Sequence, residues 1–243
     1  TCNTLELVGY ADLGSCCFGE KPVVKALAIA KAVARAIEGH KGHDDGRFGS
    51  EECMVGHYVV CTVRNRLADA KGPLPAVVLV HGGPWVRGGY WGWHPMAQFL
   101  ASRGYVVIEP EFRGSTGYGD THFKAGFKQW GQAMQDDVAD ALRWAQKQGL
   151  ASDKACIAGA SYGGYATLIG LIKDPELYKC GISWVGVTDI DLLFDIHWSD
   201  SSDAIKKYSL KETVGDQKKD AEQFRRTSPL HRAAELKAPL LLA

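Results

Sequence analysis

The chain has 243 residues, of which 46% are hydrophobic, so it can bury one substantial core and is not expected to be disordered. Its 28 basic and 28 acidic residues cancel, which excludes a strong overall field that would hold the protein on nucleic acid or an anionic membrane. We therefore predict no nucleic-acid or membrane partner, and a small molecule or peptide as the substrate. The sequence does not indicate the oligomeric state of the protein.

The seven cysteines are an odd number and show no paired metal-ligand spacing. We interpret them as reduced thiols, with Cys156 and Cys180 acting as small core residues. A disulfide framework is the alternative.

The best candidate for a membrane segment, residues 22–37, is short and is interrupted by Lys25, Lys31 and Arg35. It is typical of an amphipathic helix, and no signal peptide opens the chain. These absences favour the cytoplasm. Because Thr1 is not an initiator methionine, a processed or partial chain is also expected.

Two regions of the chain differ in the regularity of their hydrophobic pattern. Residues 1–70 are irregular, with a possible helix at 22–39 and a possible sheet-edge strand at 57–63, and we assign them no function. Residues 71–243 alternate short apolar runs with helical patterns, which indicates a mostly parallel sheet covered by helices on both faces.

Within residues 71–243 we predict five strands, three helices and one polar excursion. The strands are 76–80, 105–111, 155–160, 181–187 and 238–243; the helices are 95–104, 130–148 and 163–172; the partly helical excursion is 190–230. The longest helix carries Val138, Ala141, Leu142 and Ala145 on one face and is expected to stop at Gly149.

The segment Gly159-Ala160-Ser161-Tyr162-Gly163 matches G-x-S-x-G between a predicted strand and a predicted helix. Glycines are needed there because the turn is tight and holds the serine in a strained conformation. The helix N-terminus behind the serine favours developing negative charge. We therefore predict that Ser161 is a catalytic nucleophile in an α/β-hydrolase fold.

A second segment, His81-Gly82-Gly83-Pro84-Trp85, directly follows a predicted strand. In this fold that loop supplies one backbone N–H of the oxyanion hole and the residue after the nucleophile supplies the other, which selects Gly83 and Tyr162. We interpret His81 as a structural residue of the loop. Trp85 and Tyr162 are predicted to line an apolar substrate pocket, with a core role as the alternative for Trp85.

From about Pro73 onward the chain resembles the catalytic domain of the prolyl oligopeptidase family, in particular its acylaminoacyl-peptidase and dipeptidyl-aminopeptidase-like branch. Four stretches carry the resemblance: His81 to Trp85, Phe112-Arg113-Gly114-Ser115-Thr116-Gly117-Tyr118-Gly119, Trp130-Gly131 followed by Asp136-Asp137, and Gly159 to Tyr165.

The resemblance implies a serine-type peptidase that cleaves short peptides through an acyl-enzyme on Ser161. It also implies a β-propeller that restricts access to the site, but residues 1–70 show no four-strand repeat. Without a β-propeller that admits only short peptides, the protein could instead be a general carboxylesterase, which is the alternative. The sequence shows no motif of metal-ligating residues and no nucleotide-binding loop, so we predict no cofactor.

The resemblance places the catalytic Asp and His beyond Ala243, so we expect the last strands and helix of the fold, with these two residues, to be missing. A replacement triad from Asp189 with His197 or His231 keeps the chain order Ser, Asp, His and is a further alternative. A helix-capping role for Asp189 and a packing role for His231 are the simpler interpretations. A non-catalytic α/β-hydrolase-like binding protein is the competing hypothesis.

Overall fold

The computed structural model describes residues 59–62, 72–89, 94–195 and 205–243. Its elements, in chain order, are β1 (Val59–Thr62), β2 (Leu74–Val80), α3 (Pro95–Ser102), β3 (Val106–Pro110), α4 (Asp120–Ala125), α5 (Ala133–Lys147), β4 (Ala151–Ala160), α6 (Tyr162–Lys173), β5 (Cys180–Trp184), η2 (Asp191–Phe194), η3 (Ile205–Leu210), α7 (Lys211–Thr213), α8 (Ala221–Thr227), η4 (Pro229–Glu235) and β6 (Leu240–Leu242). The predicted helix at 22–39 lies outside the described residues.

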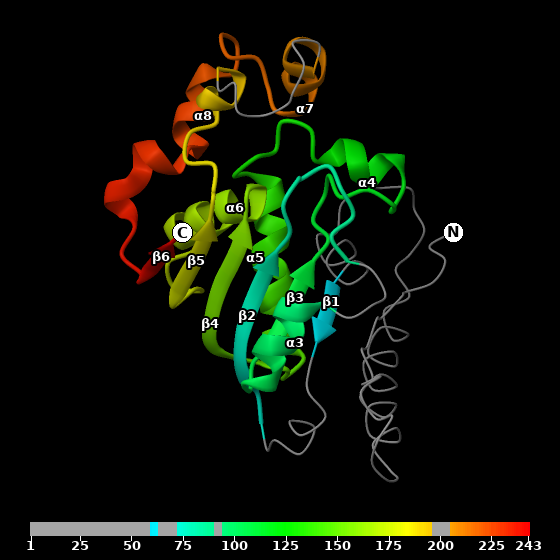
Figure 1. Cartoon of the computed structure of the whole chain (residues 1–243), viewed down its shortest axis with the longest axis vertical. Helices are drawn as coiled ribbons and strands as arrows, with labels where there is room; N and C mark the ends of the chain where they lie inside the picture. Colours follow the sequence, from blue (N-terminus) through cyan, green and yellow to red (C-terminus); the bar gives the residue numbers. More distant parts are fainter. Residues whose placement is uncertain (1–58, 63–71, 90–93, 196–204) are drawn as a thin grey trace.

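The strands form one sheet in the order β1-β3-β2-β4-β5-β6. From β3 to β6 every neighbouring pair is parallel, whereas β1 pairs antiparallel with β3 at the edge. The predicted mostly parallel sheet is therefore confirmed, and β1 lies within the stretch 57–63 in which we predict an edge strand. Figure 1 shows the parallel strands pointing toward one end of the sheet, where α4, α7 and α8 lie.

Helices α5 and α6 cover one face of the sheet, and α3 covers part of the other (Figure 1). The main core lies under α5 and α6, because alternate residues of each strand point toward these helices. The four residues predicted to form the apolar face of α5 are all fully buried. Helix α5 ends as expected, since Gly149 adopts a positive φ of 70° just beyond its last turn.

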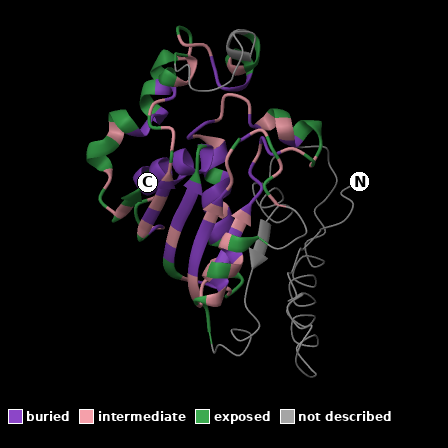
Figure 2. Cartoon of the chain, viewed as in Figure 1, coloured by how far each residue is buried: buried purple, intermediate pink, exposed green. Residues whose placement is uncertain are grey.

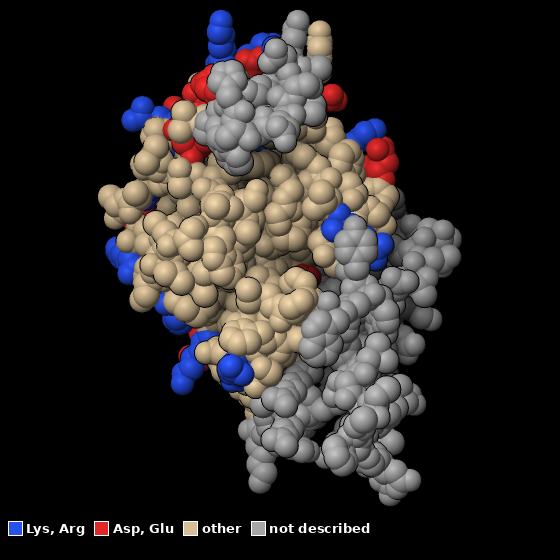
Figure 3. Space-filling model, in the orientation of Figure 1, with Lys and Arg blue, Asp and Glu red and all other residues tan. Residues whose placement is uncertain are grey.

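The face under α3 has a much smaller core, which consists of Ala97, Ala101 and Val107 with Leu79 and Leu100 against them. Figure 2 shows buried residues concentrated in the central strands and exposed ones increasing toward β6. In β6, Leu241 and Leu242 are 58% and 64% exposed. Figure 3 shows that charged side chains lie mostly at the rim of this face of the molecule.

Most element boundaries differ from the sequence predictions by a few residues, and one short helix was not predicted. Strand β5 ends at Trp184 rather than continuing to residue 187, because Val185 has a φ of 39° that a strand cannot contain. Helix α6 begins at Tyr162, one residue before the expected start. The short helix α4 follows the glycine-rich loop and was not predicted.

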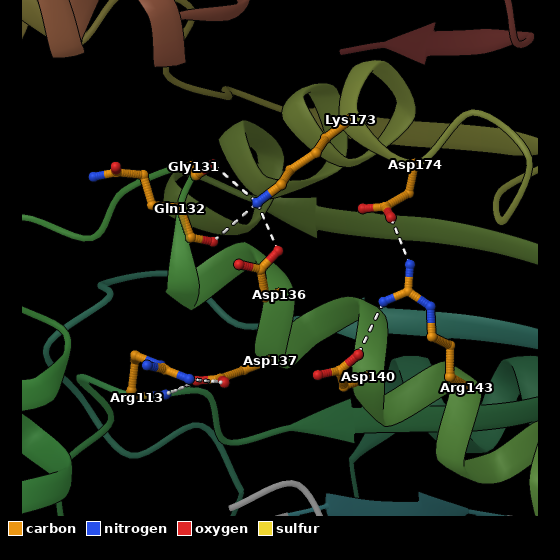
Figure 4. Close-up of polar contacts among 9 residues, drawn as sticks. All are labelled: Arg113, Gly131, Gln132, Asp136, Asp137, Asp140, Arg143, Lys173 and Asp174. Atoms are coloured by element: carbon orange, nitrogen blue, oxygen red, sulfur yellow. Dashed lines mark hydrogen bonds and ion pairs between the residues drawn. The ribbon is translucent and has the colours of Figure 1, made fainter. Parts of the chain in front are cut away.

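Charged side chains join α5 to the end of α6 (Figure 4). The Lys173 ammonium lies 2.6 Å from the Asp136 carboxylate and also donates to the carbonyls of Gly131 and Gln132. The Arg143 guanidinium bridges Asp140 on its own helix and Asp174 just beyond α6. Because these groups keep partial contact with solvent, each pair stabilises the packing of the two helices only modestly.

The interpretation of Cys156 and Cys180 as unpaired core residues is wrong. The structure joins them by a disulfide between β4 and β5, where they are direct partners in the strand register, with Cα atoms 4.7 Å apart. Their side chains face away from the main core, since the neighbouring Ala155 and Ile157 occupy it. Sequence spacing did not reveal this pairing because it depends on which strands are adjacent.

Candidate active site

Ser161 joins the central strand β4 to α6 at a sharp turn. Its φ of 56° and ψ of −118° lie in a region that residues other than glycine rarely occupy. A Cβ at Gly159 would lie 2.5 Å from the Val80 carbonyl oxygen, and one at Gly163 would collide with the same oxygen. The two glycines therefore let the turn and α6 pack directly against β2, as the motif predicted.

The turn leaves Ser161 exposed while the residues that follow it in α6 are buried. The Ser161 N–H donates to the Trp184 carbonyl at 2.9 Å, so it is already used within the fold. The N–H of Tyr162 lies at the first position of α6, where the helix itself provides no acceptor. Of these two amides, the Tyr162 N–H, which the sequence predicts as an oxyanion donor, is therefore the one without an acceptor in its own helix.

The loop 81–89 approaches this turn from the end of β2. A Cβ at Gly82 would lie 3.1 Å from the Ala160 carbonyl oxygen and 3.5 Å from the Ser161 Cβ, so the loop runs beside the nucleophile with room for little more than a glycine. The next residue, Gly83, has a φ of 114°, which favours glycine. The peptide that links Gly82 to Gly83 carries the Gly83 N–H, the predicted second donor.

His81 supports this loop from inside. Its Nδ1 lies 2.7 Å from the Gly82 carbonyl oxygen, its Nε2 lies 3.0 Å from the Ser115 Oγ, and its ring stacks on Phe112 at 4.4 Å. Burial lowers the pKa of His81 to about 4, so the ring is neutral near pH 7. Both ring nitrogens are engaged within the loop region, which supports the structural role predicted for His81.

Glu111 is a buried carboxylate at the site that the sequence prediction missed. It follows β3, its side chain is 1% exposed, and it accepts hydrogen bonds from the Gly88 and Gly89 N–H groups. Burial raises its pKa to about 7, although the two N–H donors and the charge of Arg87 act in the opposite direction. An acidic residue directly after a buried apolar strand was the signal that could have identified it.

The predicted pocket residues lie among aromatic side chains. Tyr162 is 1% exposed and packs against Phe112 and Trp130, so its side chain belongs to the core rather than to an open pocket. Trp85 is partly buried and meets Phe127 edge-on at 5.5 Å. This packing favours the core role that the sequence left open for Trp85.

The glycine-rich loop 112–119 is fixed by an ion pair (Figure 4). The Arg113 guanidinium donates to both carboxylate oxygens of Asp137 at 2.8 and 2.6 Å, and the Arg113 backbone N–H donates to the same carboxylate at 2.8 Å. Asp137 is 8% exposed. The loop segment and the paired acidic residues noted in the sequence are thus parts of one contact between the loop and α5.

The residues of the alternative triad are brought together only in part. The Asp189 carboxylate lies 3.4 Å from the His231 Nε2 and also accepts hydrogen bonds from the Ser228 hydroxyl and the Asp191 N–H. Among the described residues, no hydrogen bond connects this pair to Ser161. His197 lies outside the described residues.

The sequence comparison decides the family. Residues 91–243 match the prolyl oligopeptidase family of peptidases. The chain belongs to this family. The matched range contains the nucleophile turn, the Arg113–Asp137 pair and the Asp189 loop, while the His81 to Trp85 loop lies just before it.

Named members of the prolyl oligopeptidase family are similar over much of the chain. Dipeptidyl aminopeptidase BIII from Pseudoxanthomonas mexicana is 41% identical over 184 residues, which cover 73% of this chain and 26% of that protein. Dipeptidyl peptidase family member 6 from Caenorhabditis elegans is 42% identical over 119 residues, 49% of this chain and 16% of the relative. The chain thus spans about a quarter or less of the length of these relatives.

Solved structures of family members agree with the fold. The acylaminoacyl peptidase of Pyrococcus horikoshii aligns with a TM-score of 0.62 and 32% identity over 71% of this chain and 27% of its own. A puromycin-hydrolyzing peptidase of Mycobacterium tuberculosis aligns with a TM-score of 0.64 and 28% identity over 71% of this chain and 26% of its own. The α/β-hydrolase fold predicted from the sequence is therefore confirmed.

Proposed function

We propose that this chain carries the nucleophile and oxyanion hole of a serine-type peptidase that cleaves short peptides through an acyl-enzyme on Ser161. One observation carries the proposal: Ser161 is exposed, has a strained backbone, lies at the N-terminus of α6 and faces Gly82 of the neighbouring loop. A turn with no catalytic role would not need a serine in this conformation.

The arrangement provides for the acylation step. The Ser161 Oγ attacks the peptide carbonyl carbon, its proton passes to a general base, and the amine leaves after it has received that proton. The carbonyl oxygen becomes negative and is held by the Tyr162 and Gly83 N–H groups. Loss of one such donor typically lowers the rate by roughly 100- to 1,000-fold. The dipole of α6 adds to this stabilisation.

The substrate class rests on the relatives. Their names describe a dipeptidyl aminopeptidase and an acylaminoacyl peptidase. We extend peptide cleavage to this chain because it belongs to the same family and shares the nucleophile turn. Hydrolysis of simple esters and binding without catalysis are outcomes that the experiment below distinguishes.

The cellular compartment of the protein also remains to be tested, and two observations favour different compartments. None of the described helices is both long and apolar enough to cross a membrane. The sequence favoured the cytoplasm, but the Cys156–Cys180 disulfide favours an oxidising compartment, because such bonds are rare in the cytosol. Alkylation of the protein immediately after cell lysis tests this: a protected Cys156–Cys180 pair supports an oxidising compartment, and two alkylated thiols support the cytoplasm.

Covalent labelling tests the proposed activity. The chain is treated with a fluorophosphonate probe, and turnover of peptide anilides and p-nitrophenyl esters is followed, with Ser161→Ala as the matched control. We expect weak labelling and slow anilide turnover, both absent from the variant, because the oxyanion hole and substrate binding retain a small part of the catalysis without a general base. Ester turnover alone would replace the peptidase with an esterase. A folded chain that is neither labelled nor active would support the binding protein.

If the chain is labelled, the variants His231→Ala and Asp189→Ala test whether this pair provides the general base for Ser161. Because the described residues show no hydrogen bond from this pair to Ser161, we expect both variants to be labelled at nearly the rate of the unchanged chain. A rate reduced by about 100-fold or more in both variants would support the alternative triad.

A further inference from the structure

The loop 81–89 is attached at its far end to Glu111. Gly88 donates its N–H to one carboxylate oxygen at 3.2 Å, and Gly89 donates its N–H to the other. A protonated carboxyl group cannot accept equally well at both oxygens, because one of them then carries hydrogen. One N–H donor on each carboxylate oxygen therefore favours the ionised form of Glu111.

The attachment continues from Gly88 to the imidazole of His81. A Cβ at Gly88 would lie 2.8 Å from the His81 Cβ and would overlap the ring, so the Gly88 backbone packs directly on the imidazole. The Glu111 Oε2 itself lies 3.8 Å from the His81 Nε2. The position of Gly88, set by Glu111, therefore restricts where the His81 ring can lie.

His81 in turn sets the orientation of the predicted oxyanion peptide. The Gly82 carbonyl oxygen can only accept, so the His81 Nδ1 must carry the proton that joins them at 2.7 Å. The peptide between Gly82 and Gly83 is trans, since Gly83-Pro84 is the only cis bond among the described residues. In a trans peptide the N–H points away from the carbonyl. The hydrogen bond from His81 therefore fixes the direction of the Gly83 N–H.

We propose that Glu111 is a positioning residue whose ionised carboxylate, acting through Gly88 and His81, holds the Gly83 N–H in the direction required of an oxyanion donor. The proposal rests on the proposed function, because it assigns Gly83 a catalytic task. It goes beyond that function by adding a buried acid that controls the donor from the opposite end of the loop.

The groups that face Glu111 make its protonation state sensitive to pH near neutrality. They are the neutral ring of His81, the Ser115 hydroxyl, the Gly88 and Gly89 N–H groups and the positive charge of Arg87. Burial outweighs the stabilising donors and raises the Glu111 pKa to about 7. Donor orientation should therefore weaken as the pH falls below about 7.

Amide NMR tests the proposal without requiring activity. The chain is labelled with ¹⁵N-glycine, and the signals of Gly82, Gly83, Gly88 and Gly89 are followed from about pH 5 to pH 9. We expect all four to shift with one midpoint near the Glu111 pKa of about 7, and this common midpoint to disappear in Glu111→Gln. Glu109→Gln is the matched control, since Glu109 lies near the end of β3, two residues before Glu111, but pairs with His94; it should retain the midpoint.

Two NMR results would overturn the proposal. If Gly88 and Gly89 titrate while Gly82 and Gly83 do not, Glu111 holds only the far end of the loop. If none of the four titrates with Glu111, the carboxylate does not control the loop at all. Because the wild-type titration is informative by itself, the test does not depend on the folding of a variant.

Labelling kinetics supply the catalytic readout. We expect Glu111→Gln to lower the fluorophosphonate labelling rate of Ser161 by about tenfold at pH 8, which is less than the roughly 100- to 1,000-fold cost of losing a donor completely. Glu111→Asp, which keeps the charge, should recover part of the rate. An unchanged rate and pH profile in Glu111→Gln would contradict the proposal. A wild-type chain that is not labelled would instead refute the proposed function and leave the NMR result intact.

Discussion

The carbonyl oxygen of Val80, at the end of β2, occupies the space that a Cβ at Gly163 would need. The same oxygen lies 2.5 Å from the position of a Cβ at Gly159. Two glycines on either side of Ser161 are thus required by one backbone atom of the neighbouring strand. The nucleophile turn depends on the packing of β2 against β4 as much as on its own sequence.

Gly163→Ala is expected to destabilise the protein strongly. The new methyl group would overlap backbone atoms that cannot rotate away, so we expect a loss of roughly 3 kcal/mol or more in the free energy of unfolding. Gly149→Ala is the matched control, since nothing lies within 4 Å of its Cβ position and only its positive φ is unfavourable; it should cost about 1 kcal/mol. Urea denaturation measures both, and equal losses would contradict the argument.

Ser161→Gly is expected to stabilise the protein while abolishing probe labelling. Glycine relieves the strain of a φ of 56°, which costs on the order of 1–3 kcal/mol, and part of this gain is offset by the greater freedom of glycine in the unfolded chain. We expect a net gain of about 1 kcal/mol in thermal denaturation experiments. Ser161→Ala removes the same hydroxyl but keeps the Cβ, so an equal gain in this variant would show that strain is not the cause.

Adjacent acids on α5 should differ sharply in their contribution to stability. Asp137→Asn breaks a buried bidentate pair and leaves the Arg113 charge without compensation, which should cost about 3 kcal/mol. Asp136→Asn breaks a more exposed pair with Lys173 and should cost less than about 1 kcal/mol. Chemical denaturation of the two variants at pH 7 compares them directly, and similar losses would show that burial does not matter here.

Stability should depend on pH through Glu111. Its pKa rises from 4.5 to about 7 on folding, so folding favours the neutral acid, and this contribution is complete below pH 4.5 and lost as the pH rises to about 7. The unfolding free energy of the unchanged chain, relative to Glu111→Gln, should therefore fall by roughly 3 kcal/mol across this range. His81 acts in the opposite direction, but it is present in both proteins. Urea denaturation at pH 4.5, 6 and 8 measures the difference, and a constant difference would contradict the expected pKa.

The sequence predicted those features of the fold that depend on local pattern. The glycines around Ser161 identified the strand, turn and helix, and the apolar face of α5 was correct residue by residue. The features that it missed depend on contacts between distant segments. Glu111 became a site residue because β3 ends beside the loop that follows β2, and Asp137 because α5 crosses the loop that begins at Arg113.

Side-chain direction also limited the prediction. The predicted role of Tyr162 as a backbone donor stays a prediction, but the first turn of α6 directs its ring away from an open pocket and into the cluster with Phe112 and Trp130. Cys156 and Cys180 are 24 residues apart and become neighbours only when β5 pairs with β4. No local signal in either segment indicates this arrangement.

The covalent link between β4 and β5 has a geometric consequence for the nucleophile. A slip of one residue between paired strands would turn every side chain to the opposite face of the sheet. With Cys156 bonded to its register partner Cys180, such a slip is impossible in the oxidised chain. The Ser161 N–H meets the Trp184 carbonyl at the other end of the same two strands. The disulfide thus determines, from outside the site, which carbonyl the nucleophile's amide can reach.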